Sequence, residues 1–227
     1  MHPFEIPADV QARVTARRGR PFAFERIVPP RTALVVIDLQ NAFLSPGSAG
    51  EVPMARAIVP TVNRLAAAAR RRGGCVVWVQ MQADAGRADG GWPVFFGELF
   101  SPQVSRAYIC GLHPGSEGHR LWPELEVHAT DLRAAKDRFS AFLPGACDLG
   151  PRLRDRGVDT LLIAGTLTSV CCESSARDAA MLGFRVIMVS DANASRTDED
   201  HRASLIALYQ SFADVRSSAE VLDLLRE

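Results

Sequence analysis

Lysine is almost absent from this chain of 227 residues, because 25 of its 26 basic side chains are arginine and Lys136 is the single lysine. No Gly-Lys pair exists, which excludes a phosphate-binding P-loop. A solvated positive charge tolerates exchange of lysine for arginine, whereas a small site that needs a compact ammonium does not. Lys136 is therefore either a surface lysine kept by chance or a functional group, and composition leaves both interpretations open.

Long hydrophobic runs are also missing. The longest strongly apolar, uncharged stretch, residues 160–172, falls well short of the roughly 18–20 residues that span a bilayer. The N-terminus lacks the apolar segment of a secretory signal. The 26 basic and 26 acidic side chains cancel, which argues against a nucleic-acid or membrane surface. We expect a cytoplasmic protein with no nucleic-acid or membrane partner.

The sequence also lacks the patterns of a disulfide framework, a zinc site and a serine-hydrolase site. The five cysteines, an odd number, do not form a disulfide framework. The five histidines show no spacing typical of a zinc site, and no Gly-x-Ser-x-Gly elbow of a serine hydrolase occurs. His201, near the start of a predicted helix, is interpreted as a structural hydrogen-bonding residue.

Apolar, β-branched runs alternate with helical patterns along most of the chain. Strands are expected at residues 33–38, 75–80, 132–135, 158–164, 184–189 and 213–216. Helices are expected at residues 53–72, 148–156, 170–182 and 198–212, and from about residue 217. This alternation predicts an α/β fold with a mostly parallel sheet covered on both faces.

The chain contains no linker that would divide it into several domains. Residues 1–31 are predicted to form an irregular, arginine-rich arm, and residues 32–227 a single domain. Residues 83–130 are rich in glycine, proline and aromatic side chains, and this insertion exceeds ordinary loop lengths. It is expected to be a lid, a pocket wall or a subunit contact.

Polar side chains follow several of the predicted strands, at the edge where open parallel sheets bind ligands. Asp38 ends the first strand, Lys136 follows the third, and Cys171 opens the helix after the fourth. A cysteine is nucleophilic as the thiolate, which a helix start and an ammonium stabilise and a carboxylate can generate. The alternative interpretations are that Asp38 forms a turn and that Cys171 is a small core residue.

Three segments together carry a resemblance to a known family. ALVVIDLQNAF (residues 33–43), KDRFSAF (136–142) and AGTLTSVCCESSARDA (164–179) resemble the isochorismatase-like cysteine hydrolases. The resemblance runs from about residue 31 to the C-terminus. It implies a three-layer α/β/α domain with a six-stranded, mostly parallel sheet, assembled into a homodimer or homotetramer.

The same resemblance assigns roles to individual residues. It implies a catalytic triad of Asp38, Lys136 and Cys171. It also implies a cis peptide between Thr166 and Leu167, with the backbone amides of Leu167 and Cys171 forming an oxyanion hole. The candidate residues for binding substrate are Gln40, Gln80, Phe139 and Arg196, of which Arg196 falls near the position that holds a substrate carboxylate in one branch of the family.

Departures from the family pattern narrow the expected function. Cys171 is present, whereas true isochorismatases, which act on a vinyl ether, lack it; this favours C–N cleavage. The segment 80–84 lacks the histidine of the nicotinamidase metal site, so no metal and no cofactor are predicted. The chain is similar to the amidases of ureido and carbamoyl compounds, such as N-carbamoylsarcosine amidase and ureidoacrylate amidohydrolase. We therefore expect a cysteine-dependent amidohydrolase that cleaves a small amide or ureido compound through an acyl-thioester on Cys171.

Two other classes of function stay open. One is hydrolysis of a vinyl ether or an ester, which product analysis would separate from amidase action. The other is a protein without turnover, either a thiol-redox module built on the adjacent Cys171 and Cys172 or a non-catalytic assembly protein. Adjacent cysteines rarely form a disulfide because the ring is strained, which argues against the redox interpretation.

Overall fold

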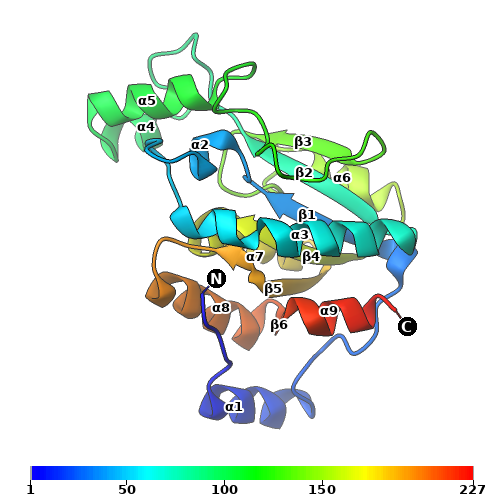
Figure 1. The fold of residues 1–227 in the computed structure, drawn as a ribbon. Helices are drawn as coiled ribbons and strands as arrows, with labels where there is room; N and C mark the ends of the chain where they lie inside the picture. The colour runs from blue at the N-terminus through cyan, green and yellow to red at the C-terminus, as the bar shows by residue number, and fades with distance from the viewer. Residues whose placement is uncertain (1, 227) are drawn as a thin grey trace.

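The computed structural model describes residues 2–226 and has a six-stranded sheet at its centre (Figure 1). Neighbouring strands all run parallel, in the order β3-β2-β1-β4-β5-β6. The strands are β1 (Thr32–Ile37), β2 (Cys75–Met81), β3 (Leu132–Lys136), β4 (Thr160–Thr166), β5 (Arg185–Ala194) and β6 (Asp214–Arg216). This arrangement confirms the predicted α/β fold, although β5 continues five residues beyond the predicted end at residue 189.

Helices cover both faces of the sheet and complete the three layers (Figure 1). They are α1 (Ala8–Arg18), α2 (Asn41–Leu44), α3 (Pro53–Arg71), α4 (Pro93–Glu98), α5 (Pro102–Leu112), α6 (Leu149–Arg154), α7 (Glu173–Met181), α8 (Asp198–Ser211) and α9 (Ser218–Leu224), with a short 3-10 turn, η1 (Pro29–Arg31), and a π-helical turn, η2 (Thr168–Cys172). One apolar core joins the sheet to α1, α6, α7 and α8. A second core joins the opposite face to α2, α3 and α9. Strands buried on both faces explain the continuous apolar runs of the sequence.

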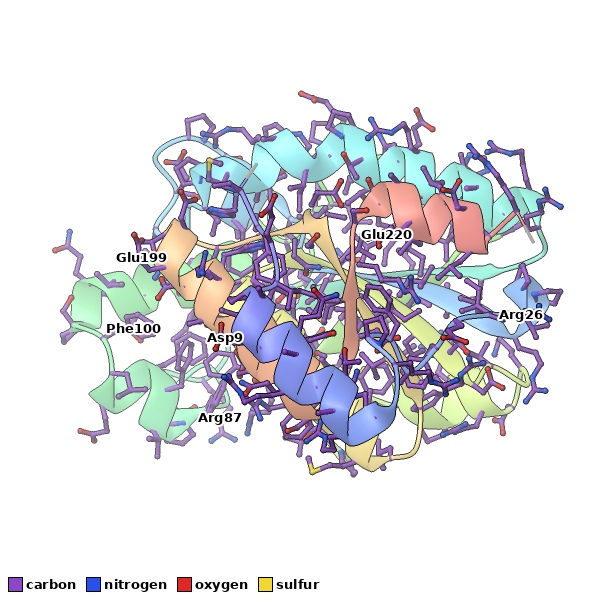
Figure 2. The ribbon with its side chains drawn as sticks, turned by 90° about the horizontal axis from the view of Figure 1, so that it is seen from below. Asp9, Arg26, Arg87, Phe100, Glu199 and Glu220 are labelled. Carbon is purple, nitrogen blue, oxygen red and sulfur yellow. The ribbon has the colours of Figure 1, made fainter. Side chains whose placement is uncertain are left out.

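The N-terminal segment departs from the irregular arm that the sequence predicts, because it contains α1. Val10 and Val14, one helical turn apart, are buried against α8, and Gly19 ends the helix in the left-handed conformation. Viewed from below, α1 lies across α8 (Figure 2). The helix depends on this docking, since its arginine-rich sequence has only a narrow apolar stripe.

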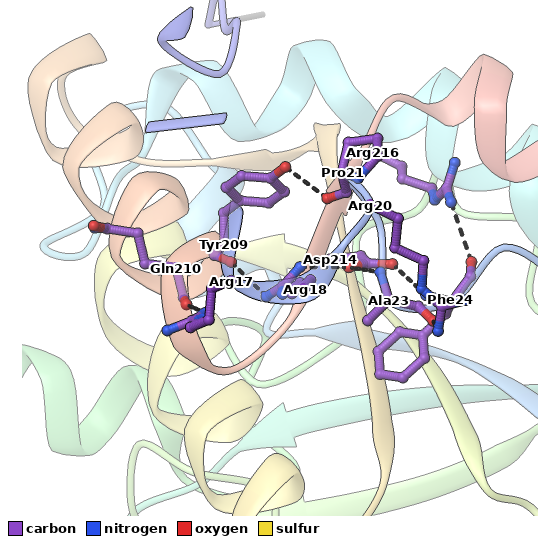
Figure 3. A network of polar contacts seen from close by, with 10 residues as sticks. All are labelled: Arg17, Arg18, Arg20, Pro21, Ala23, Phe24, Tyr209, Gln210, Asp214 and Arg216. Atoms are coloured by element: carbon purple, nitrogen blue, oxygen red, sulfur yellow. Dashed lines mark hydrogen bonds and ion pairs between the residues drawn. The ribbon is translucent and has the colours of Figure 1, made fainter. Parts of the chain in front are cut away.

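The chain that follows α1 is fastened to the domain by polar contacts (Figure 3). The buried carboxylate of Asp214 accepts hydrogen bonds from the backbone amides of Ala23 and Phe24 and from the Arg18 guanidinium. The Tyr209 hydroxyl donates to the Pro21 carbonyl over 2.6 Å. Residues 18–24 are thus held against α8 and β6.

The aromatic-rich insertion forms a small unit of its own that includes α4 and α5. Phe96, Tyr108, Ile109 and Leu112 form a third apolar cluster with Met81 and a neighbouring alanine. Because α5 packs against α2, which follows β1, this unit stands at the end of the sheet where β1 terminates. Figure 1 shows α4 and α5 together at this end of the molecule. No helix within residues 2–226 has the length and apolar character needed to cross a membrane.

Candidate active site

Three side chains of complementary chemistry meet at the carboxyl ends of the strands. Asp38 follows β1, Lys136 is the last residue of β3, and Cys171 lies in η2 after β4. The Lys136 Nζ atom is 2.7 Å from Asp38 Oδ2 and 3.4 Å from Cys171 Sγ. The Asp38 and Lys136 side chains are 1% and 0% exposed, so this ion pair is removed from water. The ammonium therefore contacts both the carboxylate and the thiol.

Burial and charge act against each other on the pKa of each of these groups. Burial raises the pKa of the Asp38 carboxyl, against the opposing effects of Lys136 and the Cys171 thiol. Burial lowers the pKa of Lys136, but the charges of Asp38 and Cys171 outweigh it and raise this pKa to about 12. Burial and the Asp38 charge raise the pKa of the Cys171 thiol, which Lys136 offsets in part. The resting site thus favours an ammonium, a protonated thiol and a carboxylate that can receive the thiol proton.

The backbone at Asp38 is unusual. Asp38 has φ of +56° and is the one non-glycine residue with positive φ in the described part of the chain. Such a conformation is uncommon for a residue with a side chain and is concentrated at functional sites. The Asp38 amide still donates to the Val79 carbonyl, whereas Asp38 Oδ1 has no hydrogen-bond partner within residues 2–226. One carboxylate oxygen holds Lys136, and the other is free to accept a proton.

Close packing of β4 against β1 fixes the position of η2. Gly165 has φ of +121°, and a Cβ atom there would overlap the Ile37 carbonyl. Only glycine allows this approach. The peptide bond between Thr166 and Leu167 is cis. Within residues 2–226 the Leu167 amide donates to no acceptor, while its carbonyl accepts from the Val170 and Cys172 amides.

A cavity of about 150 Å³ adjoins the thiol and the carboxylate. Its lining is formed by Asp38, Phe43, Gly50, Met81, Phe95, Phe100, Tyr108, Leu112, Phe139, Thr166, Leu167, Val170, Cys171 and Arg196. The cavity therefore joins the ends of β1, β2 and β4 to the α4–α5 unit. The insertion forms a pocket wall, which is one of the three roles expected for it.

The predicted substrate-binding residues divide into two pairs. Phe139 and Arg196 line the cavity. Gln40 and Gln80 lie outside its lining in the described chain, contrary to expectation. The Gln40 amide donates to the Met81 and His119 carbonyls and accepts from the Met81 amide, and the Gln80 amide also donates to His119. These two glutamines tie the insertion to the sheet and are better described as structural.

Arg196 differs from the other charged groups of the cavity. It is an exposed residue in the short connection between β5 and α8, and its Nη2 atom donates to the Tyr108 hydroxyl over 3.3 Å. No carboxylate within residues 2–226 forms an ion pair with it. Arg196 is therefore a cation with unused capacity to bind an anion.

The sequence did not single out the aromatic side chains that form the rest of the wall. Phe43 comes from α2, Phe95 from α4, and Tyr108 from α5, while Phe100 lies between the two helices of the insertion. For the three rings of the insertion the signal was the density of aromatic residues in an overlong connection, whereas Phe43 lies outside that segment. That density indicated the segment but not which of its rings face the thiol.

A second buried polar cluster lies behind η2. The His201 Nδ1 atom is 2.9 Å from Thr168 Oγ1, and its ring stacks on His2 at 4.7 Å between centroids. The His2 Nδ1 atom is 2.5 Å from Asp198 Oδ1. Burial, assisted by His2, lowers the pKa of His201 to about 4. These contacts connect the N-terminal segment to the turn that carries Cys171. No group of three or more His, Cys, Asp or Glu side chains within residues 2–226 is arranged to hold a metal ion.

Known proteins share both the sequence pattern and the fold. The family profile of the isochorismatase domain matches residues 32–220. The ureidoacrylate amidohydrolase RutB of Variovorax paradoxus is 31% identical over 198 residues, which cover 82% of this chain and 77% of that protein.

Two solved structures extend the likeness to the fold. A cysteine hydrolase from Pseudomonas syringae pv. phaseolicola superimposes with a TM-score of 0.78 at 29% identity, covering 88% of this chain and 94% of the other. The N-carbamoylsarcosine amidase of Thermoplasma acidophilum does so with a TM-score of 0.66 at 26% identity, covering 83% and 96%. The fold, the profile and these relatives agree with the resemblance seen in the sequence, and the chain belongs to the isochorismatase family of hydrolases.

Proposed function

We propose that this protein is a cysteine-dependent amidohydrolase that cleaves the C–N bond of a small amide or ureido compound. The observation that carries the proposal is the contact of one ammonium, Lys136 Nζ, with both Asp38 Oδ2 and Cys171 Sγ beside a cavity. The similarity to a ureidoacrylate amidohydrolase and to an N-carbamoylsarcosine amidase supports C–N cleavage. Neither relative fixes the substrate.

The first half of the proposed reaction forms an acyl-enzyme. Asp38 Oδ1, which has no other partner in the described residues, takes the proton of the Cys171 thiol. The thiolate, stabilised by Lys136, attacks the carbonyl carbon, and a C–S bond forms. The backbone amides of Leu167 and Cys171 donate to the oxyanion. Asp38 then gives its proton to the departing nitrogen, and the C–N bond breaks.

The second half regenerates the enzyme with water. Asp38, again a carboxylate, removes a proton from water as the oxygen attacks the thioester carbon. The C–S bond breaks, the acid is released, and the sulfur recovers a proton from Asp38. An amide thus gives a carboxylic acid and ammonia, and a carbamoyl group gives a carbamate that decays to carbon dioxide and ammonia. Lys136 holds the negative charge in place throughout.

The raised pKa of the Cys171 thiol determines when the thiolate forms in this scheme. Because burial and Asp38 raise the pKa of the thiol, the thiolate forms only while Asp38 takes up the proton. The proton transfer and the attack on the carbonyl are therefore coupled. Among the cysteines of residues 2–226, only Cys171 both contacts Lys136 Nζ through its thiol and lines the cavity.

Ammonia release from a panel of primary amides, ureido acids and carbamoyl amino acids tests the proposal. We expect turnover that Cys171→Ala abolishes with the fold intact, as judged by circular dichroism. Cys172→Ala is the matched control, because Cys172 is a buried neighbour that does not line the cavity among the described residues. Equal turnover by the wild type and Cys171→Ala would refute the mechanism. No ammonia from any compound would favour vinyl-ether or ester hydrolysis or the thiol-redox interpretation.

A further inference from the structure

The walls of the cavity beside Cys171 are largely carbon. Five of the lining side chains are aromatic, namely those of Phe43, Phe95, Phe100, Tyr108 and Phe139. The Phe95 ring makes edge contacts with the rings of Phe100 and Phe139, at 4.9 Å and 5.1 Å between centroids. Phe100 in turn stacks on Tyr108 at 5.2 Å. These contacts hold the rings in a connected wall, so the shape of the cavity is set before substrate binds.

Apart from Arg196, few polar side chains on the lining remain free for a ligand. The Thr166 hydroxyl donates to the Ala194 carbonyl, and the Tyr108 hydroxyl accepts from Arg196. Asp38 and Cys171 are committed to the reaction. Within residues 2–226 the lining holds no asparagine, glutamine or histidine that could accept a hydrogen bond from a ligand. An N–H group that a substrate places against the rings of Phe95, Phe100 and Phe139 would lose its hydrogen bonds to water without replacement.

The size of the cavity matches a particular kind of substituent. Its volume is about 150 Å³. An apolar cavity of roughly this volume accommodates a benzene molecule. A six-membered ring therefore fills the space, whereas a methyl group leaves most of it empty and forgoes the burial of apolar surface.

We propose that the physiological substrate is a primary carboxamide whose acyl group is an apolar, ring-sized unit, as in benzamide or cyclohexanecarboxamide, and not a ureido acid. This inference rests on the proposed amidohydrolase function. The ring lies against Phe95, Phe100 and Phe139, and the carboxamide carbon faces Cys171 Sγ. A C–S bond replaces the C–N bond, ammonia leaves with the proton carried by Asp38, and water then releases the ring carboxylate. A ureido acid would place its additional N–H group against the carbon wall.

Substrate preference tests the inference directly. We expect kcat/KM for benzamide and cyclohexanecarboxamide to exceed that for acetamide and for N-carbamoylglycine by at least tenfold. Acetamide is the size control, and N-carbamoylglycine represents the ureido acids. If N-carbamoylglycine is hydrolysed as well as benzamide or better, in a reaction that needs Cys171, the inference is overturned and the proposed function stands. If no compound gives Cys171-dependent ammonia, both fail.

A change in the wall provides a second test. Phe100→Ala enlarges the cavity, so the ratio of kcat/KM for 1-naphthamide to that for benzamide should rise at least fivefold. Phe24→Ala is the matched control, since Phe24 is a half-buried ring outside the cavity lining, and its ratio should stay at the wild-type value. Should Phe100→Ala fail to fold, Phe100→Leu is expected to move the ratio in the same direction. An unchanged ratio in a folded Phe100 variant would overturn the inference.

Binding without turnover gives a third readout. Titration calorimetry of folded Cys171→Ala with benzamide and with N-carbamoylglycine compares the two ligand classes in the same cavity. Tighter binding of benzamide supports the inference, and equal or tighter binding of N-carbamoylglycine contradicts it.

Discussion

Removing the ammonium from the buried pair is the perturbation with the largest expected effect on stability. Lys136→Met keeps the length and much of the volume of the side chain but leaves Asp38, 1% exposed, without its partner at 2.7 Å. Breaking a buried ion pair from one side costs about 3–5 kcal/mol, because the remaining carboxyl must either stay charged out of water or take up a proton. Since small domains are stable by roughly 5–15 kcal/mol, this loss is a large fraction of the total.

The pH dependence of the variant has a definite sign. Without Lys136 the pKa of Asp38, already raised by burial, rises further above its unfolded value of 3.8. Above pH 3.8 the folded variant then binds a proton that the unfolded chain has released, so its stability falls as the pH rises. The stability difference between wild type and Lys136→Met should therefore be larger at pH 8 than at pH 5.

Urea unfolding followed by tryptophan fluorescence measures both quantities. Arg13→Met, which removes an exposed partner of Asp9, is the surface control and should leave the unfolding midpoint nearly unchanged. The double variant Asp38→Leu/Lys136→Met replaces both charges and should recover much of the stability lost in Lys136→Met. The reasoning is refuted if Lys136→Met costs less than about 1 kcal/mol, or if the difference grows as the pH is lowered.

Three further predictions concern single side chains. Lys136→Arg should lower kcat/KM by at least about a hundredfold despite preserving the charge, because a planar guanidinium does not fit where a compact ammonium contacts two groups; near-wild-type activity would contradict this. The pKa of His201 is about 4 in the folded protein and ordinarily 6.5, so the unfolded chain binds a proton at a higher pH than the folded protein does. Lowering the pH from 6.5 to 4 should therefore cost about 3 kcal/mol of unfolding free energy, measured by urea titration. His201→Gln should lose less stability over this pH range, and a loss as large as that of the wild type would contradict the prediction. Arg196→Gln should reduce kcat/KM for 4-carbamoylbenzoate relative to benzamide at least fivefold; an unchanged ratio would exclude Arg196 as the anion-binding group.

Sequence pattern was sufficient for the strands and for the convergence of the three catalytic candidates. The strand β1 is buried on both faces and apolar along its length, so the polar residue Asp38 marks its end, whereas Lys136 ends β3, an edge strand in which Arg133 and Ala135 are exposed. The ends of parallel strands share one edge of the sheet, which brings these residues together with Cys171. The family resemblance supplied the roles that spacing alone left open.

Features that depend on tertiary contacts could not be predicted from the sequence. The helix α1 forms from a polar segment because Val10 and Val14 dock on α8, and nothing local signals that partner. Gln40 and Gln80 follow the same strand-end rule as Asp38, yet their amides bind the carbonyl of His119, a residue about 40 or more positions away. The position of a polar residue at the end of a strand therefore does not show whether its side chain lines the cavity or binds the insertion.

The complete burial of Lys136 has a consequence for the chemistry of the whole molecule. Since this is the chain's single lysine and its side chain is 0% exposed, the folded protein presents no ε-amino group to solvent. Reagents that acylate lysine, and enzymes that acetylate or ubiquitinate it, reach this amine only when β3 separates from its neighbours. Acylation of Lys136 is thus a single-site reporter of the opening of the domain, free of the background that surface lysines create in most proteins.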